Sequence, residues 1–214
     1  MLFNSLTEEI GTCILHDRPD TWSCTLSSDG NYTVKSTRDY LDKRMLPSSN
    51  VTSVWFKFLP RKVNVFLWRL RLDSLPARWN LFAKGIEINS IVCPVCSNGV
   101  ETRDHLFFDC EMALDLWHKI GIWLDCDMPC FSSWDSFMAW IEGVRLQVSS
   151  KNRIIAVVVS MLWAIWHFRN GIVFSNAFCS KSSLFDIIRL LTFRWIKNRG
   201  HLVSKWNLWL AMPL

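Results

Sequence analysis

Hydrophobic side chains recur at helical spacing along much of this chain. After Pro60, the residues Val63, Phe66, Leu67 and Leu70 follow one another at i, i+3, i+4 and i+7, which places them on one face of a helix. Proline suits the first turn of a helix because the amide hydrogen that it lacks would have no partner there. The spacing therefore predicts an amphipathic helix that begins near Pro60 and buries this face.

The same periodicity returns after residue 110. Ala113, Trp117, Ile120 and Leu124 stand at i, i+4, i+7 and i+11, which predicts a helix over residues 112–124. Similar patterns, together with capping residues and prolines, predict further helices. These cover residues 36–43, 76–83, 101–108, 133–147, 151–174 and 183–198.

Alternating β-forming residues are confined to the N-terminal part of the chain. Residues 22–26 and 31–35 are two such runs, and the Asp29-Gly30 pair between them is a turn signal of β-hairpins. The predicted fold is therefore mainly α with a small N-terminal β-hairpin, which is a helix-dominated α+β class.

A long apolar run lies between Arg153 and Arg169. Its fifteen residues, 154–168, carry no formal charge, but about 20 are needed to cross the hydrocarbon core of a membrane. The run therefore predicts a buried core helix, and no membrane partner is expected. The first residues also lack the basic segment and the continuous apolar stretch of a signal peptide. We accordingly expect an intracellular protein, nuclear or cytoplasmic, that is not secreted.

Composition indicates a large aromatic core. Half of the 214 residues are hydrophobic, with 13 Trp and 14 Phe against 2 Tyr, and so many apolar rings require burial or a partner surface. This length supports one sizeable core, or one domain with an appended helical part. The predicted organisation is a lead-in over residues 1–20, a domain over 21–125 and a C-terminal helical region over 126–214.

Positive charge is concentrated in two segments. The whole excess of +5 falls within residues 181–214, where six cations face Asp186 alone. These cations are Lys181, Arg189, Arg194, Lys197, Arg199 and Lys205. In residues 57–84, seven cations face Asp73 alone. They are Lys57, Arg61, Lys62, Arg69, Arg71, Arg78 and Lys84.

The cations of residues 57–84 are interleaved with Trp55, Phe56, Trp68 and Trp79. Cations that meet phosphates and rings that stack on bases are the usual means of holding single-stranded nucleic acid. These seven cations, with four from the C-terminal segment (Arg189, Arg194, Lys197 and Arg199), are the candidate nucleic-acid-binding residues. A solvated basic face over an aromatic core explains the same pattern, so both interpretations stay open.

A metal-ligand pattern occupies the middle of the chain. Cys93 and Cys96 are separated by two residues, and His105 and Cys110 follow after eight and four intervening residues. A Cys₃His set suits tetrahedral Zn²⁺ and leaves no open position for a catalytic water, so we predict one structural zinc ion. A redox pair or inert buried thiols are the alternatives.

The other cysteines carry weaker signals. Cys126 and Cys130 form a candidate second half-site, but no further ligand pair stands nearby at metal spacing. Without a metal role, the five cysteines outside the zinc set are predicted to be reduced thiols. They are Cys13, Cys24, Cys126, Cys130 and Cys179.

Several motifs in order resemble a known family. They are Trp55, the run LPRKVNVFLWR over residues 59–69, Leu75-Pro76, Leu81, Gly85, the Cys₃His set with Glu101 within it, and Trp117. Across roughly residues 22–124 they resemble the zinc-binding region that follows the reverse transcriptase in LINE-type (non-LTR) retrotransposons of plants. Trp163, Trp166, Arg169-Asn170 and Phe174 resemble the segment that often follows it. The resemblance implies a reverse transcriptase as a partner and association with RNA-directed DNA polymerase.

Signatures of catalysis are missing from the sequence. It contains no Asp-Asp pair of the kind that holds polymerase metals, no phosphate-binding glycine loop and no nucleophile elbow, and its acidic residues do not suggest a ribonuclease H site. We therefore expect no enzyme activity from the chain by itself. Two functions stay open: a zinc-stabilised module that helps to bind RNA or primed DNA, and a module that docks on a polymerase or another protein through its Trp-rich surface.

Overall fold

The computed structural model describes residue 11 and residues 22–27, 29–45, 55–174, 180–199 and 209. The chain divides into two compact units, residues 1–52 and residues 53–214, and each is treated by itself. Nearly all of the predicted lead-in over residues 1–20 lies outside the described residues, as do Cys13, Cys179 and Lys205.

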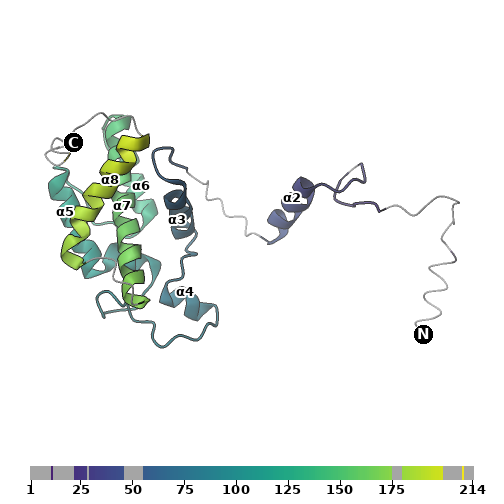
Figure 1. Ribbon diagram of the computed structural model, residues 1–214, viewed down its shortest axis with the longest axis horizontal. Helices are drawn as coiled ribbons and strands as arrows, with labels where there is room; N and C mark the ends of the chain where they lie inside the picture. Colours follow the sequence, from purple (N-terminus) through teal and green to yellow (C-terminus); the bar gives the residue numbers. More distant parts are fainter. Residues whose placement is uncertain are drawn as a thin grey trace. The chain divides into compact units, whose positions relative to one another are not determined.

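The described part of the N-terminal unit is a turn followed by helix α2, Val34–Met45 (Figure 1). The turn is closed by a hydrogen bond from the Cys24 amide to the Gly30 carbonyl, at 2.7 Å. Residues 22–27 and 29–45 contain no strand, so the predicted hairpin is wrong for them. Thr33 explains why the second predicted strand, residues 31–35, does not form. Its hydroxyl accepts a hydrogen bond from the Ser36 amide at 3.0 Å and so caps the start of a helix in that segment.

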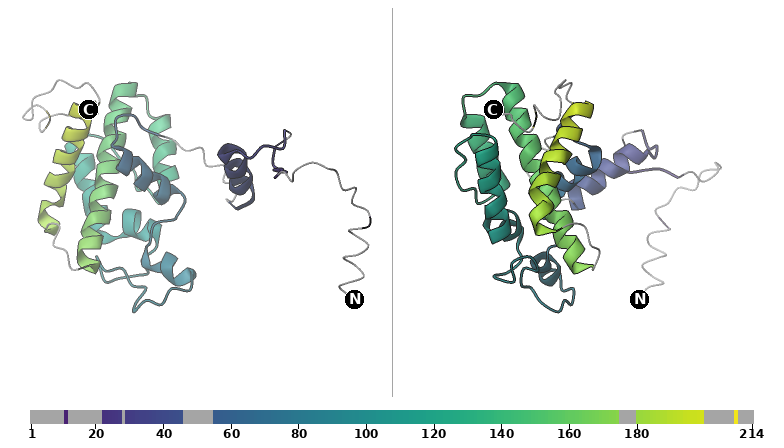
Figure 2. Two further views of the ribbon diagram at one scale, coloured as in Figure 1. Left: turned by 45° about the vertical axis from the view of Figure 1, so that its right-hand side comes forward. Right: turned by 60° about the vertical axis from the view of Figure 1, so that its left-hand side comes forward.

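The second unit is built mainly of helices, with one isolated antiparallel bridge between Val92 and Val100 among its described residues (Figures 1 and 2). Its elements are α3 (Arg61–Arg71), α4 (Arg78–Ala83), the π-helix η1 (His105–Asp109), α5 (Glu111–Trp123), α6 (Trp134–Gly143), α7 (Val148–Val173), the 3₁₀ turn η2 (Lys181–Ser183) and α8 (Leu184–Arg199). The predicted helix-dominated class is confirmed.

Helix α7 forms the centre of this unit. Residues 154–162 are all buried, and α8 lies alongside α7 in each view (Figures 1 and 2). The Thr192 hydroxyl of α8 donates to the Ser160 hydroxyl of α7 at 2.9 Å, so the polar groups in this contact are paired. Among the described residues, α7 is the one helix long and apolar enough to cross a membrane, and 61% of its most apolar stretch is buried inside the protein. The predicted buried helix is confirmed.

Helix α3 packs on α7 through the face that its periodicity predicts. Val63, Phe66, Leu67 and Leu70 are all buried, and the ring of Phe66 meets that of Trp163 edge-on at 5.3 Å between centroids. The i, i+3, i+4 and i+7 spacing was enough to predict this buried face, because residues three and four apart lie on the same side of a helix.

Asn64 fixes the segment that leads into α3. Its side chain is buried, accepts from the Phe56 amide at 2.9 Å and donates to the Phe56 carbonyl at 3.0 Å. One buried amide thus satisfies both backbone groups of a non-helical residue. It positions residues 56–60 against the helix.

Many of the aromatic rings are packed around Trp117 on α5. Its ring stacks on Phe108 with 5.9 Å between centroids and contacts Phe131 and Phe137 at 5.0 and 5.9 Å. The indole N–H donates to the Phe107 carbonyl at 3.1 Å. This core contains residues from both sides of position 125, so the boundary between 21–125 and 126–214 stays a prediction from sequence.

Candidate metal centre

The first half of the metal site is a tight backbone turn that begins at Cys93. The Cys93 amide donates to the Gly99 carbonyl at 3.0 Å, and the Ser97 amide donates back to the Cys93 carbonyl at 2.9 Å. Gly99 has a φ of 77°, and a Cβ atom added to it would lie 3.4 Å from Cε1 of His105. Glycine at this position therefore serves both the turn and the close approach of the histidine ring.

The second half is the π-helix η1, which carries His105 at its start. The Cys110 amide donates to the His105 carbonyl at 2.6 Å, which is the i to i+5 bond of a π-turn. The predicted helix over residues 101–108 is thus partly corrected, because its last turn is wider than an α-turn. The wider turn returns Cys110 to the side of His105.

The four predicted ligands come together in space. The sulfur atoms of Cys93, Cys96 and Cys110 and a ring nitrogen of His105 all lie within 4.8 Å of one another. Cys96 Sγ is 3.3 Å from Nε2 of His105. Tetrahedral zinc with bonds of about 2.3 Å to sulfur holds two sulfurs about 3.8 Å apart, so the cluster has the right dimensions.

Electrostatics at the site also favour a cation. A hydrogen bond from Cys110, followed by backbone hydrogen bonds from Cys96 and Val95, lowers the pKa of Cys93 to about 5 against the effect of burial. The same contact with Cys93, together with burial, raises the pKa of Cys110. Two buried thiols thus compete for one proton, and a divalent cation removes the competition because it binds both as thiolates.

Residues 32–117 match a family model described as zinc-binding in reverse transcriptase, and this segment contains all four clustered residues. This segment is similar to the zinc-binding region of reverse transcriptases. The family predicted from the sequence motifs is therefore confirmed, and the cofactor is zinc.

A relative from Arabidopsis thaliana supports the same assignment. Its provisional name is ribonuclease H protein, and its sequence is 28% identical to this chain over 105 residues. The match covers 47% of this chain and 17% of that protein, so the chain spans only a small part of its relative. No solved structure matches the chain.

A buried ion pair supports the zinc-binding region from α7. Arg169 Nε and Nη2 lie 2.6 and 2.8 Å from the two carboxylate oxygens of Glu101, and the two side chains are 3% and 0% exposed. The Glu101 carboxylate also accepts from the Arg78 amide at 2.9 Å, at the start of α4. One carboxylate thus joins the metal loop, α4 and α7.

The sequence motifs contained Glu101 and Arg169 but did not reveal their role. Each residue stands in a segment that resembles the family, and Arg169 is the charge that ends the apolar run of α7. They are 68 residues apart, so no local spacing rule pairs them.

The candidate cations occupy several different surroundings. Lys57, Arg61, Lys62, Arg69 and Lys84 are exposed, and Arg71 and Arg78 are half-buried. On α8, Arg194, Lys197 and Arg199 are exposed, and Arg189 is half-buried and paired with Asp186. Trp55, Trp68 and Trp79, which are interleaved with these cations along the sequence, are exposed as well.

The two segments rich in cations, residues 57–84 and 181–214, contact each other at Arg199. Arg199, in the last turn of α8, donates from Nη1 to the Leu59 carbonyl at 3.3 Å. The C-terminal end of α8 therefore lies beside the start of α3, which carries Arg61 and Lys62. Arg189 lies ten residues earlier on α8, about 15 Å along the helix axis. Of the α8 cations, only those near Arg199 therefore lie close to the cations of α3.

The remaining cysteines gain no metal role from the structure. Among the described residues, the Cys93 cluster is the one group of three or more His, Cys, Asp or Glu side chains suited to a metal ion. Cys126 and Cys130 lie outside it, and these two and Cys24 are free thiols.

Proposed function

We propose that this chain is a non-catalytic zinc-binding module of a retrotransposon-derived reverse transcriptase polyprotein. In this proposal, Cys93, Cys96, His105 and Cys110 hold one Zn²⁺, and the module helps to bind RNA or primed DNA. The observation that supports it is the closed Cys₃His cluster inside the segment that matches the family. Because four protein ligands fill a tetrahedral site, the ion stabilises the fold and performs no chemistry.

The nucleic-acid part of the proposal rests on the position of the cations. Arg61, Lys62 and Arg69 are exposed on α3, and Arg199 joins them from α8. Cations grouped on one side of a folded unit attract a phosphate backbone with little regard to its sequence. A protein of this kind acts where its nucleic acid is, so we propose a nuclear or cytoplasmic location.

Binding of labelled 15-nucleotide RNA and DNA strands to the zinc-loaded chain tests this function. We expect affinity to fall with salt at a log–log slope of about −0.7 per phosphate contact. Strands of different sequence should bind about equally well. Correctly folded, zinc-loaded protein that retains neither strand at low salt would contradict the proposal.

Exposed aromatic side chains on α4 favour a second function. Trp79 and Phe82 are 41% and 54% exposed, and their ring centroids are 5.9 Å apart. Ile86, directly after the helix, is also exposed. Such a patch is typical of protein contacts, so docking on a reverse transcriptase is the alternative. Trp79→Ala with Phe82→Ala should abolish polymerase capture and leave nucleic-acid binding unchanged if this function applies.

A further inference from the structure

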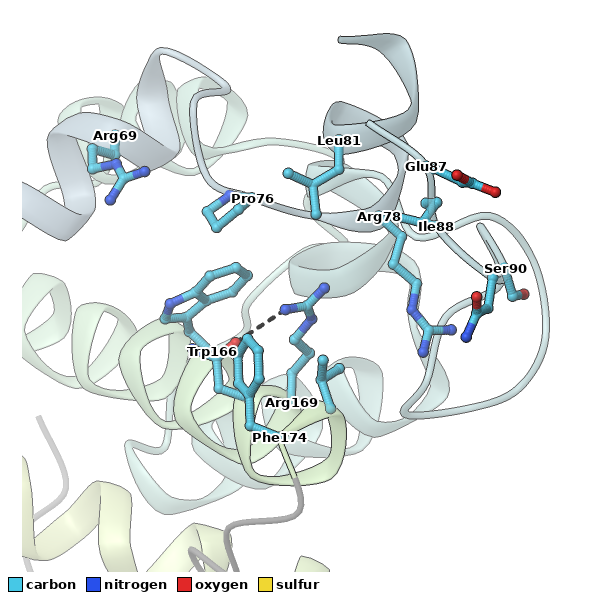
Figure 3. Close-up of a pocket in the computed structure, with 13 residues that line it drawn as sticks. Arg69, Pro76, Arg78, Leu81, Glu87, Ile88, Ser90, Trp166, Arg169 and Phe174 are labelled. Atoms are coloured by element: carbon cyan, nitrogen blue, oxygen red, sulfur yellow. Dashed lines mark hydrogen bonds between the residues drawn. The ribbon is translucent and has the colours of Figure 1, made fainter. Parts of the chain in front are cut away.

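Two adjoining hollows lie along the contact between α3 and α7. The larger has a volume of about 560 Å³ and lies between the segment 76–90 and the C-terminal half of α7 (Figure 3). The smaller, about 250 Å³, lies between α3 and α7. Arg69 and Trp166 line both of them, so the two hollows are neighbours. The larger volume falls in the range of small organic ligands.

The floor of the larger hollow is rigid. Trp166 is 9% exposed, and the guanidinium carbon of Arg169 lies 5.0 Å from the centre of its ring. Arg169 is itself fixed by both carboxylate oxygens of Glu101 and by the Asn170 side chain. The buried ion pair therefore holds an aromatic surface at the bottom of the hollow before any ligand arrives.

The rim of the hollow combines positive charge with an exposed ring. Arg69 and Arg78 line it, and Glu87 is the one acidic side chain among its described lining residues. Arg69 donates from Nη2 to the Ser74 carbonyl at 3.2 Å, which leaves other N–H groups of its five for a ligand. Phe174 is 64% exposed and stands beside Arg169 at the end of α7 (Figure 3).

Positive charge continues into the smaller hollow. Lys62 and Arg69 both line it from α3, seven residues and so about 10 Å apart along the helix axis. The Lys62 ammonium lies 5.7 Å from the centre of the Trp163 ring. Cations that alternate with aromatic rings along a groove are the arrangement by which proteins hold unpaired nucleotides.

We propose that the larger hollow binds one unpaired nucleotide, with its base against Phe174 and Trp166 and with Arg69 and Arg78 at the phosphates on either side of it. The strand continues through the smaller hollow past Lys62. This assignment rests on the proposed nucleic-acid function and adds a defined base-binding position to it. A free nucleotide and an unpaired nucleotide within a strand both offer a base and a phosphate to this site. Displacement of a bound strand by a free nucleotide distinguishes the two.

Phe174→Ala in the zinc-loaded full chain is the test, and Phe82→Ala is its matched control. Both rings are exposed, at 64% and 54%, so neither change disturbs the core. Stacking on an aromatic side chain contributes about 1–3 kcal/mol per base. Phe174→Ala should therefore weaken binding of a 12-nucleotide uridine strand about 5- to 150-fold. Phe82→Ala should leave it unchanged, and Phe174→Trp should preserve it.

An abasic strand of the same length separates stacking from charge. It should bind wild type and Phe174→Ala alike, because it offers phosphates and no bases. If wild type binds both strands equally and Phe174→Ala changes neither affinity, the base-binding position is wrong while the proposed function stands. If neither strand binds at low salt, the proposed function fails as well.

Two further measurements locate the base and identify its source. A strand with 5-iodouracil, irradiated on the protein, should crosslink within residues 163–174, whereas crosslinks confined to other segments would overturn the assignment. Uridine monophosphate that displaces the strand at micromolar concentration would identify a free nucleotide as a ligand of the hollow. Displacement only by longer strands would identify the strand itself.

Discussion

Replacement of Glu101 by glutamine tests the buried ion pair that joins the metal loop to α7. The change keeps the size of the side chain and removes its charge. Arg169, only 3% exposed, then keeps a positive charge with no anion beside it. Removal of one partner of a buried pair costs about 3–5 kcal/mol, because the other charge stays desolvated.

The geometry places this variant at the upper part of that range. Glu101 accepts two hydrogen bonds from the guanidinium, at 2.6 and 2.8 Å, and a third from the Arg78 amide at 2.9 Å. An amide has one oxygen where the carboxylate has two, so at least one of these donors loses its acceptor. For a chain of this size, each kcal/mol shifts the melting temperature by about 2–4 °C, so a loss of about 4–5 kcal/mol should lower it by about 8–20 °C.

Denaturant unfolding and thermal melting of zinc-saturated protein measure this effect. Asp115→Asn is the control, since the pair of Asp115 with Lys119 is about half exposed, at 47% and 46%. An exposed pair contributes at most about 1 kcal/mol. Glu101→Leu with Arg169→Met should recover most of the loss, because no buried charge remains. A Glu101→Gln protein within 1 kcal/mol of wild type would refute this account of the pair.

Three other predictions concern the metal, the cations and the core. Purified chain should contain about one zinc ion, and Cys93→Ser with Cys96→Ser should abolish it; unchanged zinc content by elemental analysis would rule out these ligands. Arg61→Ala with Lys62→Ala should lower the salt slope for single strands by about 0.7–1.4 without discriminating between sequences, and an unchanged slope in salt titrations would remove both contacts. Phe137→Ala should destabilise the fold by about 3–5 kcal/mol in denaturant unfolding, because its ring is fully buried; a loss below 1 kcal/mol would contradict its place in the core.

The sequence by itself determined the features that depend on near neighbours along the chain. The buried face of α3 followed from residues three and four apart, which share one side of any helix. The metal ligands followed from spacing, because two residues between cysteines allow one turn to present both thiols. The buried position of residues 154–162 followed from a run of apolar side chains without a charge.

Only the tertiary structure decided the features that join distant segments. Glu101 and Arg169 meet across 68 residues, and the hollow beside them exists only because segment 76–90 packs near the end of α7. The predicted hairpin failed for a related reason: two strands are marginal without a further partner, and none is present in residues 22–27 and 29–45. Local capping by Thr33 then favoured the helix. Spacing rules describe one element at a time, whereas the pairing of charges and the shape of a cavity depend on which elements pack together.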